Sequence, residues 1–339
     1  MEIRQIAPDD ADGVRRLVAV TNAVREADSP WLHPLTEHEC VGELAHGWDG
    51  EPALGFLATA GGVDVGAGRY EVSSYDNLHL AWLEVEIAPP HRRQGHGSAL
   101  LDALVARART EGRTSVGMTG WDAAAPADFA ARHGFAQGSV EVQRRLDVDG
   151  VPGLMVDPTE DYELVRWPRT TPDADLAALA ELTGAINDAP TDDLDVEDEV
   201  FTPERIAAYE QAWAARGGLM YRVVARHRRS GALAGQSVVV VDGERPHLVE
   251  QHDTSVLAEH RGHRLGLLLK LEVLRWLAAA EPQVREIDTW NAETNDHMIA
   301  VNELLGYRVL GRAVDYQRPI AVPPHSSGAT SRTVWVSSQ

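Results

Sequence analysis

Two loops contain glycine and arginine in an order that could bind a phosphate group. The first is Arg92-Arg93-Gln94-Gly95-His96-Gly97-Ser98, and the second is Arg261-Gly262-His263-Arg264-Leu265-Gly266. Each follows a strand-like apolar stretch and precedes leucines at helical spacing. A glycine loop at a helix N-terminus can bring backbone N–H groups and the positive end of the helix dipole close to a diphosphate.

Other phosphate-binding and metal-binding motifs fit the chain poorly. The dinucleotide motif G-x-G-x-x-G lacks its third glycine, because position 100 is Leu100. A G-K-[ST] triplet does not occur. Cys40 is the single cysteine, which excludes a disulfide framework and a cysteine-ligated metal centre. The histidines show no H-E-x-x-H spacing, so no metal is expected.

Carboxylates with strand spacing precede both loops. Glu84 and Glu86 lie two residues apart on one strand and therefore face the same side. A carboxylate there could accept a proton as a general base, or could belong to a solvated strand face. Glu250 and Asp253 are the candidates in the second half, and His252 beside them could pass protons. The acidic run 188–199 could attract a cationic amine, or could be a solvated loop.

The elements around these residues follow the same order in both halves. In the first half we expect strands at 2–6, 53–60, 63–72, 79–87 and 114–119, helices at 37–44, 97–112 and 125–133 and an earlier one after Pro8, and terminal strands up to Val148. In the second half we expect strands at 162–167, 220–227, 232–241, 248–257, 286–290 and 308–317, and helices at 173–187, 203–216, 265–280 and 296–305.

The matched order indicates two copies of one domain. The loop HRRQGHG at 91–97 returns as HRGHRLG at 260–266, and Gly134-Phe135 returns as Gly306-Tyr307. We therefore expect an α/β protein with one domain at 1–150, a linker at 151–160, a second domain at 161–319 and a tail at 320–339.

Charge and composition narrow the class of partner. The chain has 339 residues and a net charge of −21, spread over both halves, which disfavours nucleic acids and anionic lipids. It contains no apolar run of membrane-spanning length, and its start lacks the pattern of a signal peptide, so a cytoplasmic location is expected. Among the basic residues only Lys270 is a lysine, a bias typical of a GC-rich bacterial genome.

The motif Arg-x-x-Gly-x-Gly after a strand, seen in this setting in both halves, resembles the GNAT superfamily of acyl-CoA-dependent N-acyltransferases in a tandem form. The resemblance implies two domains, each a mixed, mostly antiparallel sheet flanked by helices, with acetyl-CoA bound where two parallel strands splay apart. It implies that Val85, Glu86, Ile87 and Val256 contact the pantetheine arm or the acetyl group. It also implies that residues 92–98 and 261–266 contact the diphosphate.

Each half departs from the family pattern at a different place. Arg264 stands where the second loop should have its first glycine. Asn291 and Asn295 match asparagines that bind pantetheine in this family, and the first half has none there. The family's usual tyrosine acid is replaced by Ala130 and Asn302, which leaves Ser98 or water as the proton donor.

The resemblance implies transfer of an acetyl group from acetyl-CoA to a primary amine of a small molecule by direct attack, with Glu84, Glu86 or Glu250 as the base. Two alternatives stay open: a mycothiol-synthase-like acetyltransferase, and a degenerate protein that binds acyl-CoA without catalysis. The identity of the acceptor, the catalytic domain and the oligomeric state are left open by the sequence.

Overall fold

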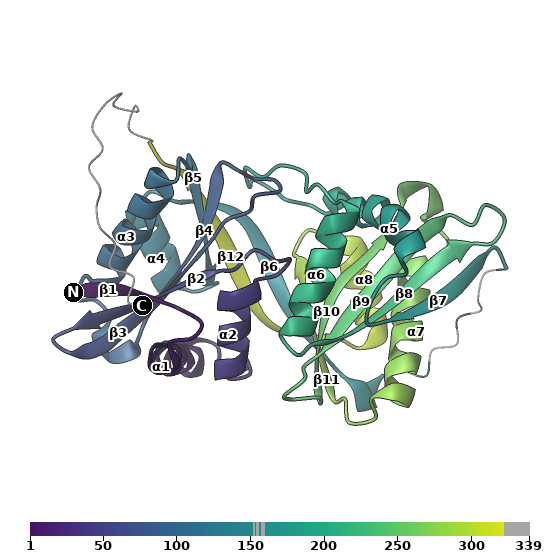
Figure 1. The fold of residues 1–339 in the computed structure, drawn as a ribbon, viewed down its shortest axis with the longest axis horizontal. Helices are drawn as coiled ribbons and strands as arrows, with labels where there is room; N and C mark the ends of the chain where they lie inside the picture. Colours follow the sequence, from purple (N-terminus) through teal and green to yellow (C-terminus); the bar gives the residue numbers. More distant parts are fainter. Residues whose placement is uncertain (152, 154–155, 157–159, 322–339) are drawn as a thin grey trace.

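In the first repeat, a strand and two helices precede three antiparallel strands, and the glycine loop follows the last of these strands. The computed structural model describes residues 1–151, 153, 156 and 160–321 (Figure 1). The elements of this repeat are β1 (Glu2–Ile6), α1 (Ala11–Asp28), α2 (Glu37–His46), β2 (Leu54–Ala60), β3 (Val63–Glu71), β4 (Leu80–Ile87), α3 (His96–Thr110), β5 (Ser115–Trp121), α4 (Ala124–Arg132) and β6 (Ala136–Asp147).

The second repeat has the same order of elements, as its sequence predicts. They are β7 (Tyr162–Pro168), α5 (Leu176–Thr183), α6 (Pro203–Ala215), β8 (Leu219–His227), β9 (Leu233–Val241), β10 (Leu248–Val256), α7 (Leu265–Ala280), β11 (Glu286–Ala292), α8 (Asp296–Leu305) and β12 (Arg308–Pro319). Most of the expected linker and tail falls outside the described residues. In the part of the chain that the structure describes, no helix combines the length and the apolar character needed to cross a membrane.

The two repeats exchange their last strands, so that one sheet runs through the whole molecule. Its order is β1-β2-β3-β4-β5-β12-β6-β11-β10-β9-β8-β7. Strand β12 of the second repeat pairs with β5 of the first, while β6 of the first repeat pairs with β11 of the second. Strands β6 and β12 then pair with each other in the middle, where Figure 1 shows them crossing between the halves.

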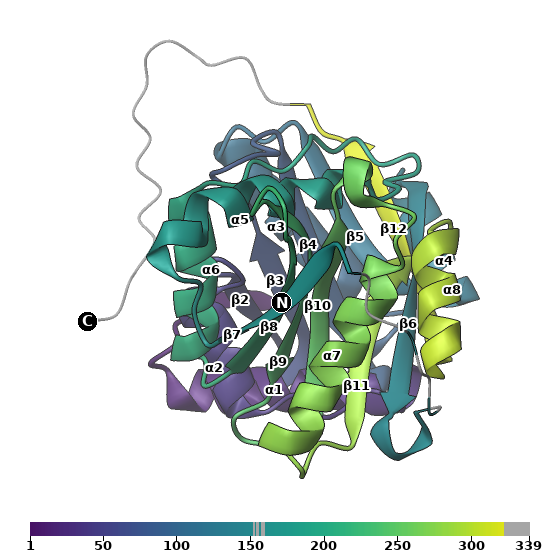
Figure 2. The same cartoon turned by 90° about the vertical axis from the view of Figure 1, so that its right-hand side faces the viewer.

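Helices cover both faces of each half-sheet. In the first repeat, α1 and α2 pack on one face through residues such as Val14, Leu17 and Leu44, and α3 and α4 pack on the other. In the second repeat, α5 and α6 share one face and α7 and α8 cover the opposite one (Figure 2). The expected α/β fold with mixed, mostly antiparallel sheets is confirmed.

The parallel strand pair of each repeat opens part of the way along its length. Strand β4 pairs with β5 from Leu80 to Leu83 and then leaves it, and β10 pairs with β11 from Leu248 to Glu250. The rest of β4, from Glu84 to Ile87, has β3 as its only partner among the described strands. The expected splayed parallel pair is therefore present in both repeats.

Candidate functional site

The loop of the first repeat has the geometry that a diphosphate site requires. Gly95 is the N-cap of α3 and adopts the left-handed conformation, with φ of 86°, and no side chain caps this helix. The unpaired N–H groups in the first turn of α3 therefore remain available to an anion. A Cβ at Gly95 would meet nothing within 4 Å, whereas one at Gly97 would lie 3.3 Å from Phe129. Gly97 thus lets α3 pack closely, and Gly95 keeps the space before the helix open.

The first arginine of each loop is engaged within the protein. Arg92 donates from Nε to the carbonyl of Ile87 at 2.9 Å and forms a two-pronged pair with Asp28 at 2.9 and 2.7 Å. Arg261 donates in the same way to the carbonyl of Val256 and pairs with Asp188. This repeated arrangement fixes each loop to the end of its strand. It makes Arg92 and Arg261 positioning residues, while Arg93 is exposed at the loop surface.

The loop of the second repeat keeps the backbone course of the first. Arg264 is the N-cap of α7 and adopts the left-handed conformation that Gly95 adopts, with φ of 59°. Its side chain is exposed, as are Gly262 and His263, while Leu265 and Gly266 are buried in the first turn of α7. The arginine therefore stands where a diphosphate would approach, and the uncapped helix end behind it is preserved.

The asparagines of the second repeat bond to neighbouring protein groups. Asn295 caps α8 by accepting from the N–H of Met298 at 3.2 Å. Asn291 accepts from Asn302 at 2.6 Å, and Asn302 in turn accepts from the Lys270 ammonium at 2.8 Å. Burial lowers the pKa of Lys270 to about 7. Asn302 thus connects the end of β11 to α7 from the position where the family has its tyrosine.

Glu84 and Glu86 face the α1 side of the sheet, as the two-residue spacing predicts. The Thr21 hydroxyl of α1 donates to Glu86 at 2.6 Å. Burial, with a smaller contribution from Glu84, raises the pKa of Glu86 to about 7. Glu84 instead forms an ion pair with Arg69 at 3.2 Å. Glu86 can therefore exchange a proton near neutral pH.

A bulge in β10 changes which residues of the two repeats correspond. Between Gln251 and Thr254, β10 contains one residue more than the segment of β9 that it faces. The pairing of β4 with β3 contains no such extra residue. Aligning the two strand pairs places Glu250 at the position of Trp82, and Asp253 at that of Glu84. Burial raises the pKa of Asp253 to about 6.

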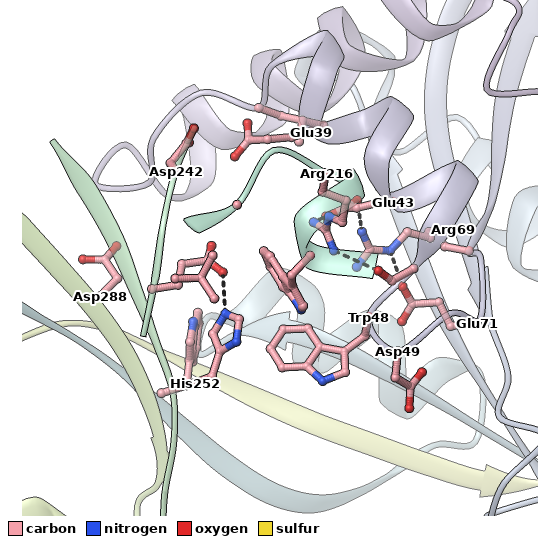
Figure 3. Close-up of a pocket in the computed structure, with 18 of the residues that line it drawn as sticks. Glu39, Glu43, Trp48, Asp49, Arg69, Glu71, Arg216, Asp242, His252 and Asp288 are labelled. Carbon is pink, nitrogen blue, oxygen red and sulfur yellow. Dashed lines mark hydrogen bonds and ion pairs between the residues drawn. The ribbon is translucent and has the colours of Figure 1, made fainter. Parts of the chain in front are cut away.

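A large cavity lies between the two repeats, with a volume of about 960 Å³. It is lined from the first repeat by α2, the following loop and β3, and from the second by α6, β10 and β11 (Figure 3). Glu250 lines it, whereas among the described lining residues neither Glu84 nor Glu86 occurs. Arg25 and Arg69, which act on the Glu86 carboxyl, do line it. The cavity therefore extends from Glu250 to the cations beside Glu86.

Four aromatic rings from both repeats pack together here, and three of them, Trp48, Trp213 and His252, line this cavity. Trp48 follows α2, Tyr209 and Trp213 belong to α6, and His252 is on β10. The His252 ring lies at centroid distances of 4.5 Å from both indoles, with interplanar angles of 40° to Trp48 and 55° to Trp213, and its Nδ1 lies 2.5 Å from the Tyr209 hydroxyl. Trp48 is 51% exposed, so one part of its ring remains open to solvent. Figure 3 shows Trp48 between His252 on one side and Glu71 and Asp49 on the other.

The acidic run 188–199, which joins α5 to α6 in the second repeat, holds the two repeats together through hydrogen bonds and ion pairs. Asn77 of the first repeat accepts from the N–H of Glu197 at 2.7 Å. Glu199 pairs with Arg205 at 3.1 Å, and the buried Arg205 also contacts Asp49 at 2.8 Å and Asp76 at 2.6 Å. Neither of the two expectations for this run included such a connection.

Two functional features were not predicted from the sequence. Ser98 lies 2.9 Å from His133 Nε2, which joins the first turn of α3 to the end of α4. The second is the exposed Trp48, for which the only available signal was a tryptophan in a loop rich in glycine and acid. Among the described residues, no group of three or more metal-ligating side chains is arranged to hold a metal ion.

Comparisons with known proteins agree with this geometry. Residues 21–135 match the family model described as Acetyltransferase (GNAT) family. The fold resembles a tandem GNAT protein from the clavulanic acid biosynthesis pathway, with 29% identity, a TM-score of 0.77 and coverage of 95% of this chain and 99% of that one. It also resembles a GCN5-related N-acetyltransferase from Sphaerobacter thermophilus at 18% identity, with a TM-score of 0.69 and coverage of 94% and 95%. Curated protein sequences give no match.

Proposed function

We propose that this chain, which belongs to the GNAT acetyltransferase family, transfers an acetyl group from acetyl-CoA to a primary amine of a small molecule. The observation that carries the proposal is the uncapped, left-handed glycine loop of α3 beside a splayed strand pair. This loop lies within the part of the chain that matches the family model. The cavity between the repeats supplies room for the acceptor.

Acetyl-CoA is assigned to the first repeat. The N–H groups at the start of α3 and the charge of Arg93 would hold its diphosphate. The backbone groups of residues 84–87 that neither β3 nor Arg92 engages would bond its pantetheine arm, because β5 does not pair with this segment. Without a Cβ, Gly95 leaves the approach to these groups open. The second loop, with Arg264 in the same place, is the weaker candidate.

Glu86 is assigned as the general base. Its pKa of about 7 suits removal of a proton from an ammonium group near neutral pH. The freed amine nitrogen attacks the thioester carbonyl, the C–N bond forms and the C–S bond breaks. The departing thiolate takes a proton from water or from Ser98. Glu250, which lines the cavity, is the alternative base of the second repeat.

A thiol-release assay with acetyl-CoA and a panel of primary amines tests this function. Amine-dependent release of free CoA, with mass spectrometry showing an acetylated amine, is the expected result. Tight binding of acetyl-CoA without turnover on any amine would instead support the acyl-CoA-binding alternative. Failure to bind acetyl-CoA at all would refute the proposal.

A further inference from the structure

The described residues that line the cavity between the repeats include more carboxylates than arginines. On one side of Trp48, Arg69 is shared by Glu43, Glu71 at 2.9 Å and Glu84 at 3.2 Å. Arg216 adds a second guanidinium, 3.6 Å from Glu43. Three carboxylates therefore share two guanidinium groups. Glu84 does not itself line the cavity, and burial raises the pKa of Glu71. We call Arg69, Glu43, Glu71 and Glu84 the Arg69 cluster.

On the other side, Glu250 forms no ion pair with a guanidinium group among the described residues, although Arg216 is near enough to help lower its pKa. Its nearest basic neighbour is His252, whose Nε2 lies 3.5 Å from the Glu250 carboxylate. Burial lowers the pKa of His252, so the ring is neutral at pH 7. The other charged groups near the ring are the guanidinium groups of Arg216 and Arg222, which lower this pKa further, and Glu210 on α6 pairs with Arg222. The Glu250 side chain is 62% exposed and therefore available to a ligand.

Two buried polar atoms at the same place lack a hydrogen-bond partner. The His252 side chain is only 4% exposed, and its Nε2 makes no hydrogen bond in the described structure. The indole Nε1 of Trp213 is also buried without a partner. Both residues line the cavity. Since buried polar atoms are nearly always paired, His252 Nε2 points to a ligand, and an ammonium group could donate to this nitrogen in its unprotonated form. The Trp213 N–H can only donate and would need an acceptor.

The exposed indole of Trp48 lies between these two sites of negative charge. A tryptophan face attracts ammonium groups and packs against the alkyl chain that carries them. The wider cavity reinforces this preference, because Arg145 is shared by Glu286 and Asp288, and Arg245 by Glu39 and Asp242. All these groups line the same space or pair with residues that line it.

We propose that this cavity binds an acceptor with two cationic amino groups, one at the Arg69 cluster and the other at Glu250, and with its apolar body on Trp48. The inference rests on the proposed function, since it specifies the amine that is acetylated. The amino group at the Arg69 cluster is the one next to Glu84 and thus nearest to Glu86. Both repeats contribute to the site, and neither forms it alone.

Calorimetry in the absence of acetyl-CoA tests the site separately from catalysis. The probes are 1,4-diaminobutane and 1,8-diaminooctane, each compared with the monoamine of equal length, n-butylamine or n-octylamine. At least one diamine should bind about tenfold or more tightly than its monoamine, and the advantage should shrink with added salt. Binding of a diamine without its acetylation would support the site and contradict the proposed function.

Charge-neutral variants test the two ends. Glu71→Gln and Glu250→Gln should each weaken the diamine to about the level of the monoamine. Asp102→Asn on α3 removes the same charge from the opposite face and should change nothing. Equal affinity for diamine and monoamine overturns the inference, as does an advantage that survives in Glu71→Gln. So does an absence of diamine binding up to about 10 mM. Circular dichroism establishes that each variant is folded.

Discussion

Replacing Glu86 with Gln should stabilise the protein at alkaline pH and not at acidic pH. Burial and the neighbouring Glu84 raise the pKa of Glu86 from 4.5 to about 7, against the lowering effect of the hydrogen bond from Thr21. The folded state therefore binds a proton that the unfolded chain has released between these values. The contribution of the protonated Glu86 carboxyl to the free energy of unfolding is fully present below about pH 4.5, and it is lost as the pH rises through about 7.

The size of the effect follows from the shift. The rise in the pKa of Glu86 corresponds to a change of about 3 kcal/mol in the free energy of unfolding. This value is an upper limit because the side chain is not fully buried. Gln resembles the protonated carboxyl and can still accept from the Thr21 hydroxyl. We expect Glu86→Gln to match the wild-type free energy of unfolding near pH 4 and to exceed it by about 1–3 kcal/mol at pH 8. Urea denaturation at both pH values measures this difference.

Glu141→Gln provides a matched control. Burial, with Asp315 and Asp192, also raises the pKa of Glu141 to about 7, and Glu141 lies on β6 away from the glycine loop. Both variants should gain stability at pH 8, whereas only Glu86→Gln should lose turnover, by about 10²–10⁴-fold. If Glu86→Gln gains nothing at pH 8, the argument from burial is refuted. If it gains stability and keeps its turnover, Glu86 is not the base and Glu250 takes its place.

Three further outcomes are expected. Gly95→Asp should weaken acetyl-CoA binding measured by calorimetry by at least tenfold, because it adds a negative charge before α3; Gly112→Asp, at a glycine with φ of 80° and equal open space after the helix, should not. Arg264→Gly should remove a left-handed side chain and tighten a second equivalent of acetyl-CoA, and unchanged stoichiometry and affinity would show that the second loop is not a cofactor site. Arg205→Met should lower the free energy of unfolding by about 3–5 kcal/mol, since it leaves Asp49 and Asp76 buried without a cation; a loss below about 1 kcal/mol would contradict this.

The sequence predicted the repeat and most element positions because both depend on local patterns. Leucine spacing after Gly97 and the paired prolines after Ile87 determine where a helix begins and a strand ends. Local patterns do not specify the partner of a strand, so the exchange of β6 and β12 was not predicted. The bulge in β10 was missed for a similar reason, since the extra residue is visible only against β9. For the candidate site, the sequence predicted the loop and the glutamates, whereas the cavity depends on how the repeats meet.

The exchanged strands also affect when the protein can fold during its synthesis. Strand β5 ends at Trp121, but its partner β12 begins only at Arg308. At roughly 5–20 residues per second, the ribosome takes on the order of 10–40 s to supply that partner. Throughout this interval the first half exposes an unpaired parallel strand edge, on which another nascent chain could add. The glycine loop of the first repeat thus acquires its complete supporting sheet only after nearly the whole chain has been made.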